Sequence, residues 1–239
     1  MEGQSINPKK AAGEKAVEYV KPGMTVGLGT GSTAYWAIQA IAARVNEGME
    51  IKAIATSTAS EDLARELQIN IISFADTDHI DITIDGADEV SATLDLIKGG
   101  GGALLREKIV AAATKLYIII ADHSKYVPVL GTFALPVEVV KFGCEMTTRH
   151  LQALGCSIKM RLSDDAPFVS DNGNFIIDCS FTAIERPEML NQQINAIPGV
   201  VENGLFLGMA DIVILGEKDG STRELRKVSG VRYEVRGMR

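Results

Sequence analysis

Two carboxylates, a lysine and a run of glycines lie close together near the middle of the chain. Asp85 ends the strand-like segment DITID and Asp88 follows it, Lys98 comes shortly after them, and the segment behind the next four glycines carries Glu107. Carboxylates exchange protons and bind hydroxyl groups, and a lysine stabilises negative charge as it develops. These residue types together predict a site for proton transfer on a small molecule.

The glycine run and the helix behind it have a functional and an ordinary interpretation. Four consecutive glycines favour close approach of the backbone to a ligand, because each glycine otherwise adds conformational entropy to the unfolded chain. Near the start of a helix the dipole favours the Glu107 carboxylate, whereas burial in a closed pocket would raise its pKa. The ordinary alternative is that Arg106, Glu107 and Lys108 form an exposed charged run.

The segment GLGTGSTA, residues 27–34, is typical of a phosphate-binding turn. Its glycines let the backbone approach an anion, and the hydroxyls of Thr30, Ser32 and Thr33 could donate to it at a helix N-terminus. The alternative is a tight turn in which Ser32 or Thr33 caps the helix. A Walker A loop requires Gly-Lys-Ser/Thr, and a dinucleotide fingerprint requires GxGxxG with a later acid, so neither interpretation fits this segment.

Polar residues also follow other predicted strands. The segment TST at residues 56–58 faces the same crevice or caps the next helix, with equal support from the sequence. Lys125, after a strongly apolar strand, could reach an anionic group, and Lys9 could do the same from the N-terminal side. Asp81 and Glu89 are interpreted as surface charges.

The elements that must position these residues alternate between strand and helix. Strands are expected at residues 24–29, 51–56, 69–74, 81–85 and 115–122, and helices at 8–20, 32–45, 59–69 and 103–114. This alternation predicts an α/β fold with a doubly wound, mainly parallel, Rossmann-like sheet. Ligands of such sheets bind beyond the carboxyl ends of the strands, where the polar residues above are expected.

The pattern changes near residue 130. Short strands such as FALPVEVV, CSIKMRL and NFIIDCSF, with two helices among them, predict a smaller α+β domain, and ADIVILG is expected to return to the first sheet. We therefore predict a main domain from residues 1–130 and 208–239 and a small domain from residues 131–207. The basic segment at residues 223–239 is interpreted as a solvated end.

Composition argues against several classes of function. The chain has 239 residues and a net charge of −7, which is unsuited to a general nucleic-acid binder. It lacks an apolar run of the ~18 residues that a membrane span requires, and its N-terminus lacks an apolar signal core, so we expect a cytoplasmic protein. Three cysteines without CxxC spacing, and paired acids without neighbouring histidines, give little support to a metal site.

Six motifs in order, from about Lys9 to about Gly220, resemble the A-type ribose-5-phosphate isomerase family: GLGTGSTA, DGADE, KGGGGALLREK, ADHSK, LPVEV and DNGNFIIDC. The resemblance implies interconversion of D-ribose 5-phosphate and D-ribulose 5-phosphate through an enediolate, without a metal or an organic cofactor. The implied partner is a small sugar phosphate. We also expect a homo-oligomer, either a dimer or a tetramer, with the small domain as a dimerisation surface.

The resemblance also implies roles for individual residues. Glu107 matches the proton acceptor, Lys98 would stabilise the enediolate, and Asp88 would position hydroxyl groups. Asp85 is the candidate for moving the proton between O1 and O2, or for opening the sugar ring. The residues that the resemblance assigns to the substrate are Thr30, Gly31, Ser32, Thr33, Asp85, Gly86, Ala87, Asp88, Lys98, Gly99, Gly100, Gly101, Lys125 and Lys9.

Two further classes of function stay open. A deaminating sugar-phosphate isomerase or a coenzyme A transferase could use a similar sheet; the first would turn over amino sugars and the second would form a glutamyl thioester. A non-catalytic sugar-phosphate sensor is the other class. Such sensors usually carry a DNA-binding module, for which the segment before the first expected strand is too short.

Overall fold

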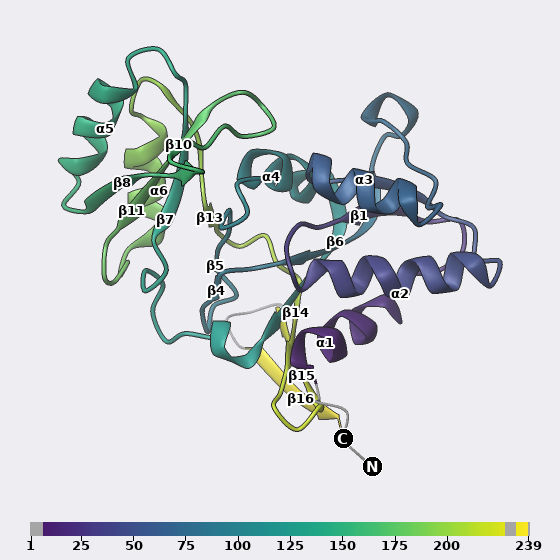
Figure 1. The fold of residues 1–239 in the computed structure, drawn as a ribbon. Helices are drawn as coiled ribbons and strands as arrows, with labels where there is room; N and C mark the ends of the chain where they lie inside the picture. Colours follow the sequence, from purple (N-terminus) through teal and green to yellow (C-terminus); the bar gives the residue numbers. More distant parts are fainter. Residues whose placement is uncertain (1–6, 228–232, 239) are drawn as a thin grey trace.

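A seven-stranded sheet forms the centre of the molecule (Figure 1). The structure is a computed structural model that describes residues 7–227 and 233–238. In chain order the strands are β1 (Thr25–Leu28), β2 (Lys52–Ala55), β3 (Ile80–Gly86), β6 (Thr114–Asp122), β14 (Ile212–Gly216), β15 (Thr222–Lys227) and β16 (Tyr233–Met238). They lie side by side as β16-β15-β14-β6-β3-β1-β2, parallel from β14 to β2 and antiparallel at β15 and β16. The expected mainly parallel sheet, with ADIVILG returning to it as β14, is confirmed.

Helices cover both faces of this sheet, which is the doubly wound α/β arrangement. They are α1 (Pro8–Val17), α2 (Ala34–Asn46), α3 (Thr58–Glu66) and α4 (Leu104–Ala112). Because side chains of a strand point alternately to its two faces, Ile118 and Ile120 of β6 join the core under α1 and α2, while Tyr117 and Ile119 join the opposite core with Ala111 of α4. The sheet is therefore buried on both sides, as a parallel sheet generally is.

A second sheet lies at one end of the first (Figure 1). Its strands, in the order β12-β7-β11-β8, are antiparallel, and two helices pack on it. The elements are β7 (Leu135–Val139), α5 (Cys144–Gln152), β8 (Ser157–Met160), β9 (Leu162–Ser163), β10 (Ala166–Pro167), β11 (Phe175–Ser180), α6 (Pro187–Asn195) and β12 (Val200–Asn203). We call residues 131–207 the small lobe. All three cysteines are free thiols that pack in its apolar core. Ile97 and Leu130 also pack in this core, so the exact domain limits stay a prediction.

A short third sheet joins the two parts of the chain. It contains β4 (Glu89–Val90), β5 (Leu96–Ile97) and β13 (Leu205–Phe206), in the order β13-β5-β4. Leu205 pairs with Ile97, and directly beyond that pair the amide of Lys98 donates to the carbonyl of Gly204 at 2.9 Å. The lysine singled out in the sequence is thus fixed through its backbone to the far end of the small lobe.

The strand expected at residues 69–74 is wrong. Only Ile71 bridges to β2, because the chain makes backbone hydrogen bonds to Ala53 on either side of that residue and then turns away. Ser73 and Asp76 form a reciprocal capping box that starts a 3-10 turn, η1 (Phe74–Asp76). The local cap therefore ends the strand after a single pairing.

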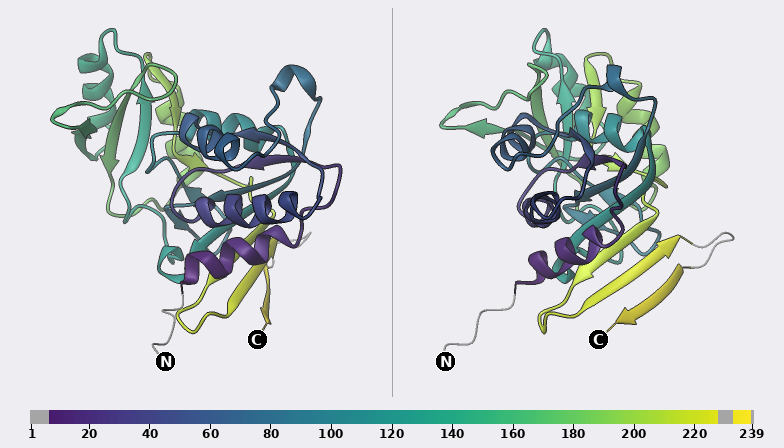
Figure 2. Two further views of the ribbon diagram at one scale, coloured as in Figure 1. Left: turned by 45° about the vertical axis from the view of Figure 1, so that its right-hand side comes forward. Right: turned by 90° about the vertical axis from the view of Figure 1, so that its right-hand side faces the viewer.

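The basic segment at residues 223–239 is a pair of sheet strands over much of its length, and the expectation of a solvated end is wrong there. β15 and β16 extend the main sheet away from the small lobe (Figure 2). Leu225 packs in the core, and the buried Glu224 accepts a hydrogen bond from Tyr19 at 2.6 Å. Residues 228–232 and 239 lie outside the described part. No helix in the described part is long and apolar enough to cross a membrane.

Candidate active site

The predicted polar loops meet at the carboxyl ends of β1 and β3. The connection that leaves β1 runs through α2 to β2 on one side, and the connection that leaves β3 runs through α4 to β6 on the other. The neighbours β1 and β3 therefore form the switch point at which such sheets bind ligands. A pocket of about 130 Å³ opens there. Its lining residues are Lys9, Thr30, Gly31, Ser32, Thr33, Gly86, Ala87, Asp88, Lys98, Gly99, Gly100, Gly101, Glu107 and Lys125. Every predicted site residue lines this pocket except Asp85, which lies behind Lys98.

Lys98 is a buried cation between two carboxylates. Its side chain is 1% exposed, and its Nζ lies 3.0 Å from Asp85 Oδ2 and 3.2 Å from Glu107 Oε1. Nζ also donates to the carbonyl of Gly86, so all three ammonium hydrogens have acceptors. The ring of Phe206 lies 5.4 Å from Nζ. Burial alone would lower the pKa of Lys98, but the charges of Asp85 and Glu107 outweigh it and raise that pKa, so the lysine stays protonated.

Glu107 is buried with one carboxylate oxygen available. The residue is 4% exposed on the first turns of α4, and Oε1 pairs with Lys98 while Oε2 has no hydrogen-bond partner within the described residues. Burial raises the pKa of Glu107 to about 8, against the opposing pull of Lys98. The interpretation of residues 106–108 as an exposed run is therefore wrong for Glu107. A carboxyl whose pKa is raised to about 8, with an unpartnered oxygen in a residue that lines a pocket, is suited to general base catalysis.

Asp85 is fully buried and holds its neighbours in place. Its Oδ1 accepts from the amides of Thr30 at 3.0 Å and Gly86 at 2.7 Å, while Oδ2 faces Lys98 and the hydroxyl of Tyr117 at 3.3 Å. Burial, followed by the charge of Asp85, raises the pKa of Tyr117 well above its usual range, which keeps the phenol a neutral donor. Tyr117 was not predicted as part of the site. Only its place within an otherwise aliphatic strand sets it apart in the sequence.

A cluster of hydroxyl groups supports the first glycine loop, at residues 27–34, on the side away from the pocket. Thr30 Oγ1 lies 2.7 Å from both Thr56 Oγ1 and Ser57 Oγ, and Ser57 also caps α3 by accepting from the amide of Ser60. The segment after β2 therefore supports the loop and caps the helix but does not line the pocket. A Cβ atom at Gly29 would come within 2.3 Å of Asp85 Oδ1, so only glycine fits beside that carboxylate.

The second glycine loop is fixed to Asp88. The amide of Gly100 donates to Asp88 Oδ2 at 2.7 Å, and a Cβ atom on Gly100 would meet this carboxylate at 2.5 Å. Gly99 has φ +98°, a conformation that residues with a side chain rarely adopt. The glycines thus serve internal packing and backbone conformation as well as open access to the pocket.

The opposite end of the pocket is open and basic. Lys9 Nζ donates to Ser32 Oγ at 2.9 Å, and Lys125 lines the same end from η2 (His123–Lys125). Gly31 has φ +101°, which turns the chain into α2. Thr33 occupies the N-cap position of α2 without a side-chain cap bond, so its hydroxyl is not used by the helix. An anion could approach the helix N-terminus and both lysines here.

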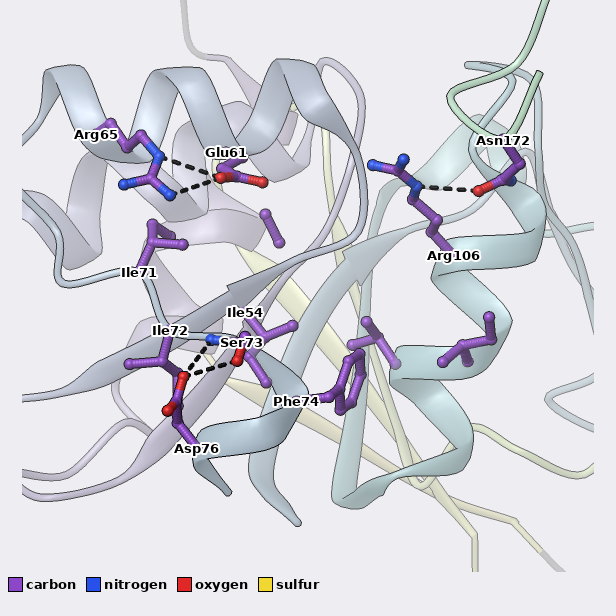
Figure 3. A pocket seen from close by; sticks show the side chains of 13 residues that line it. Ile54, Glu61, Arg65, Ile71, Ile72, Ser73, Phe74, Asp76, Arg106 and Asn172 are labelled. Carbon is purple, nitrogen blue, oxygen red and sulfur yellow. Dashed lines mark hydrogen bonds and ion pairs between the residues drawn. The ribbon is translucent and has the colours of Figure 1, made fainter. Parts of the chain in front are cut away.

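A larger cavity, of about 750 Å³, lies on the α3 side of α4 (Figure 3). Its walls include apolar side chains such as Ile54 and Phe74, and its charged groups are already paired: Arg65 with Glu61 at 2.7 Å and Arg106 with Asn172 at 3.1 Å. It lacks the free carboxylate oxygen and the buried cation of the smaller pocket. The chemistry therefore belongs to the smaller pocket.

Comparison with known proteins agrees with this geometry. The family model for ribose 5-phosphate isomerase A (phosphoriboisomerase A) matches residues 52–220. A ribose-5-phosphate isomerase A of Bacillus mycoides is 52% identical over 216 residues, which cover 90% of this chain and 98% of the relative. The chain belongs to the ribose 5-phosphate isomerase A family. Members of this family interconvert ribose 5-phosphate and ribulose 5-phosphate.

Solved structures of the family share the fold. The ribose 5-phosphate isomerase of Plasmodium falciparum superimposes with a TM-score of 0.89 at 39% identity, over 92% of this chain and 98% of that one. A D-ribose-5-phosphate isomerase solved in complex with phospho-erythronic acid also gives 0.89, at 37% identity and with the same coverage. The predicted family resemblance is thereby confirmed.

One predicted surface charge is instead structural. Glu89 is 3% exposed, and its carboxylate accepts from the amides of Gly131 at 2.7 Å and Phe133 at 2.5 Å. Backbone donors from the start of the small lobe replace the water that an exposed glutamate would have. Asp81 remains partly exposed, beside Lys115 at 3.2 Å.

Proposed function

We propose that this chain interconverts D-ribose 5-phosphate and D-ribulose 5-phosphate, with Glu107 as the base. One observation carries the proposal: a buried carboxylate with a free oxygen stands 3.2 Å from a buried ammonium in the wall of a small polar pocket. Moving a proton from C2 to C1 of the open-chain sugar requires such a base, and the negative charge that develops on oxygen requires such a cation. Sugar phosphate is the substrate class of the family.

The negative charge that faces Lys98 passes from Glu107 to the substrate as the proton moves. Before the reaction the Glu107 carboxylate accepts from Lys98; once Glu107 takes the C2 proton, it becomes neutral and the negative charge lies on the enediolate oxygen. The ammonium hydrogen that served Glu107 can then serve that oxygen. The buried cation therefore faces a negative partner at every stage, which avoids the cost of leaving a buried charge unpaired.

The two aspartates take different parts in this proposal. Asp88, on the pocket wall, positions the substrate hydroxyls. Asp85 lies behind Lys98, and we assign it to the O1–O2 proton exchange through the Lys98 ammonium, which stands between Asp85 and the pocket. In both assignments the carboxylate also fixes a loop: Asp88 holds Gly100, and Asp85 holds Thr30.

The phosphate group is assigned to the open end of the pocket. Lys9, Lys125 and the hydroxyls of Ser32 and Thr33 surround it at the N-terminus of α2. Binding the phosphate there would leave C1 and C2 at the buried end and would supply binding energy remote from the reacting carbons. The complex of a related isomerase with phospho-erythronic acid supports an anionic sugar phosphate as the ligand.

Substitution of the base tests the proposal. Glu107→Gln should lower kcat about 10³-fold or more while KM changes by less than about fivefold, because the amide keeps the shape but cannot accept the proton. The measurement is the formation of ribulose 5-phosphate from ribose 5-phosphate. Glu61→Gln is the matched control, because the half-buried Glu61 lies outside the small pocket. Turnover within tenfold of the unsubstituted chain would reject Glu107 as the base.

We further propose a cytoplasmic homo-oligomer, a dimer or a tetramer. Phe142 is 94% exposed and Met146 52% exposed on the small lobe, a surface that a second copy could cover. Light scattering after size-exclusion chromatography tests this directly. Phe142→Ser should weaken the oligomer, and a monomeric mass for the unsubstituted chain would reject the proposal.

A further inference from the structure

Arg161 reaches the second glycine loop from outside the pocket. It follows β8 in the small lobe, and its Nη1 donates to the carbonyls of Gly99 at 2.7 Å and Gly100 at 3.1 Å. Asp178 of β11 holds the guanidinium through Nε at 3.1 Å and through Nη2. The side chain of Arg161 is 14% exposed. It is absent from the pocket wall, so its contacts act on the loop and leave the cavity untouched.

Because each peptide bond is planar, these contacts to the carbonyl groups fix the orientation of the loop. In a trans peptide the carbonyl of one residue and the N–H of the next point in opposite directions. Because the Gly100 carbonyl faces Arg161, the Gly101 N–H faces away from Arg161, toward the pocket that Gly101 lines. By the same geometry the Gly99 carbonyl faces Arg161 and the Gly100 N–H reaches Asp88 on the pocket wall.

A second contact comes from Phe168, which lies at the other end of the β9–β10 hairpin from Arg161 and hinders rotation of the glycine loop. Phe168 pairs with Arg161 through its amide at 2.9 Å, and its ring covers Gly102 so closely that a Cβ atom there would lie 2.4 Å from the ring. Gly102 in turn donates to the Gly99 carbonyl at 2.9 Å. One hairpin of the small lobe therefore holds both ends of the glycine loop.

We propose that Arg161 is a positioning residue that aims the Gly101 N–H at the developing enediolate oxygen. A cation on the carbonyl side of this peptide group also polarises it and strengthens its N–H as a donor. The inference rests on the proposed isomerase reaction for its catalytic consequence. The small lobe, none of whose residues line the pocket, would then act on the reaction through one side chain.

Arg161→Met tests the inference, because methionine keeps an extended apolar stem but removes every donor. We expect kcat to fall about 10²-fold with KM changed by less than about threefold, since the loop contributes mainly in the transition state. Affinity for phospho-erythronic acid, whose carboxylate resembles the enediolate, should fall about tenfold. Lys159→Met is the matched control, because Lys159 is an exposed cation on β8 that should leave all three quantities unchanged.

Amide hydrogen exchange makes the inference independent of the assay. Exchange in a peptide covering residues 98–103 should be faster in Arg161→Met than in Lys159→Met. This result does not depend on the isomerase assay. If the unsubstituted chain failed to isomerise ribose 5-phosphate, that failure would reject the proposed function and leave the exchange result standing. Asp178→Asn, which weakens the hold on the guanidinium, should give a smaller change of the same kind and serves if Arg161→Met does not fold. Unchanged exchange, or a kcat within threefold of the control, would overturn the inference.

Discussion

The two ends of the pocket differ in how far their charged side chains are exposed to solvent. At the reacting end, Asp85, Lys98 and Glu107 are 5% exposed or less, and each is held by neighbours on other elements. At the end assigned to the phosphate, Lys9 and Lys125 are half-buried, and Ser32 is exposed. Charges act more strongly where water is excluded, whereas exposed charges are screened by salt and exchange partners freely. Under the proposed reaction, the protein excludes water from the end assigned to proton transfer and leaves the end assigned to the phosphate open to solvent.

The largest effect should come from removing the buried cation. Lys98→Met should lower kcat about 10³-fold, because the enediolate loses its cation, and should destabilise the fold by about 3–5 kcal/mol, because Asp85 and Glu107 become unpaired. Steady-state kinetics and thermal unfolding measure both. The double variant Lys98→Met, Asp85→Asn should recover part of the stability without recovering turnover. A single variant with kcat within tenfold of the original would contradict the role given to Lys98.

A smaller effect, on KM and not on kcat, is expected at the open end of the pocket. Lys125→Ala should raise KM for ribose 5-phosphate about tenfold with kcat nearly unchanged, and the difference should shrink as salt is added. Lys115→Ala is the matched control, because Lys115 lies at the amino end of β6 and Lys125 just beyond its carboxyl end. If kcat fell instead of KM rising, the two ends of the pocket would not be separable in this way.

The smallest effect concerns stability and pH. Because burial raises the pKa of Glu107 from 4.5 to about 8, the folded state holds a proton that the unfolded state releases between these values, and stability falls as pH rises through this window. Glu107→Gln removes this dependence. Its Tm should therefore exceed that of the unsubstituted chain by several degrees at pH 9 and by much less at pH 5. The same titration predicts that kcat/KM of the unsubstituted chain rises toward pH 8. A Tm difference that does not grow with pH would argue against the burial cost.

The site loops could be predicted from local sequence because the rule that places them is local. Thr30 follows the apolar strand β1 and Asp85 lies at the carboxyl end of β3, and parallel strands bring their carboxyl ends to one edge. Lys98 and the glycines required only the assumption that this edge forms the pocket. Glu107 was harder, since its neighbours Arg106 and Lys108 give the segment the composition of an exposed run.

Residues whose environment depends on distant parts of the chain could not be predicted. Glu89 resembles a surface charge until the amides of Gly131 and Phe133 enclose it. Arg161 gives no signal in its own segment, because its partners are the carbonyls of Gly99 and Gly100, which carry no side chain to reveal the contact. The strands at the end of the chain were missed because β15 and β16 read as a charged tail until β14 gives them an edge to pair with.

The backbone hydrogen bond between Lys98 and Gly204 also bears on the stage of folding at which the site is completed. Long-range pairings form late, because the loop between them must first close. During synthesis from the N-terminus, β5 has no partner in β13 until the whole small lobe has emerged, and β14 must then enter the main sheet beside β6. Until then Lys98 lacks its backbone partner and the main sheet has an unfinished edge. Completion of the site therefore waits for β13 and β14, which come after α6 in the chain.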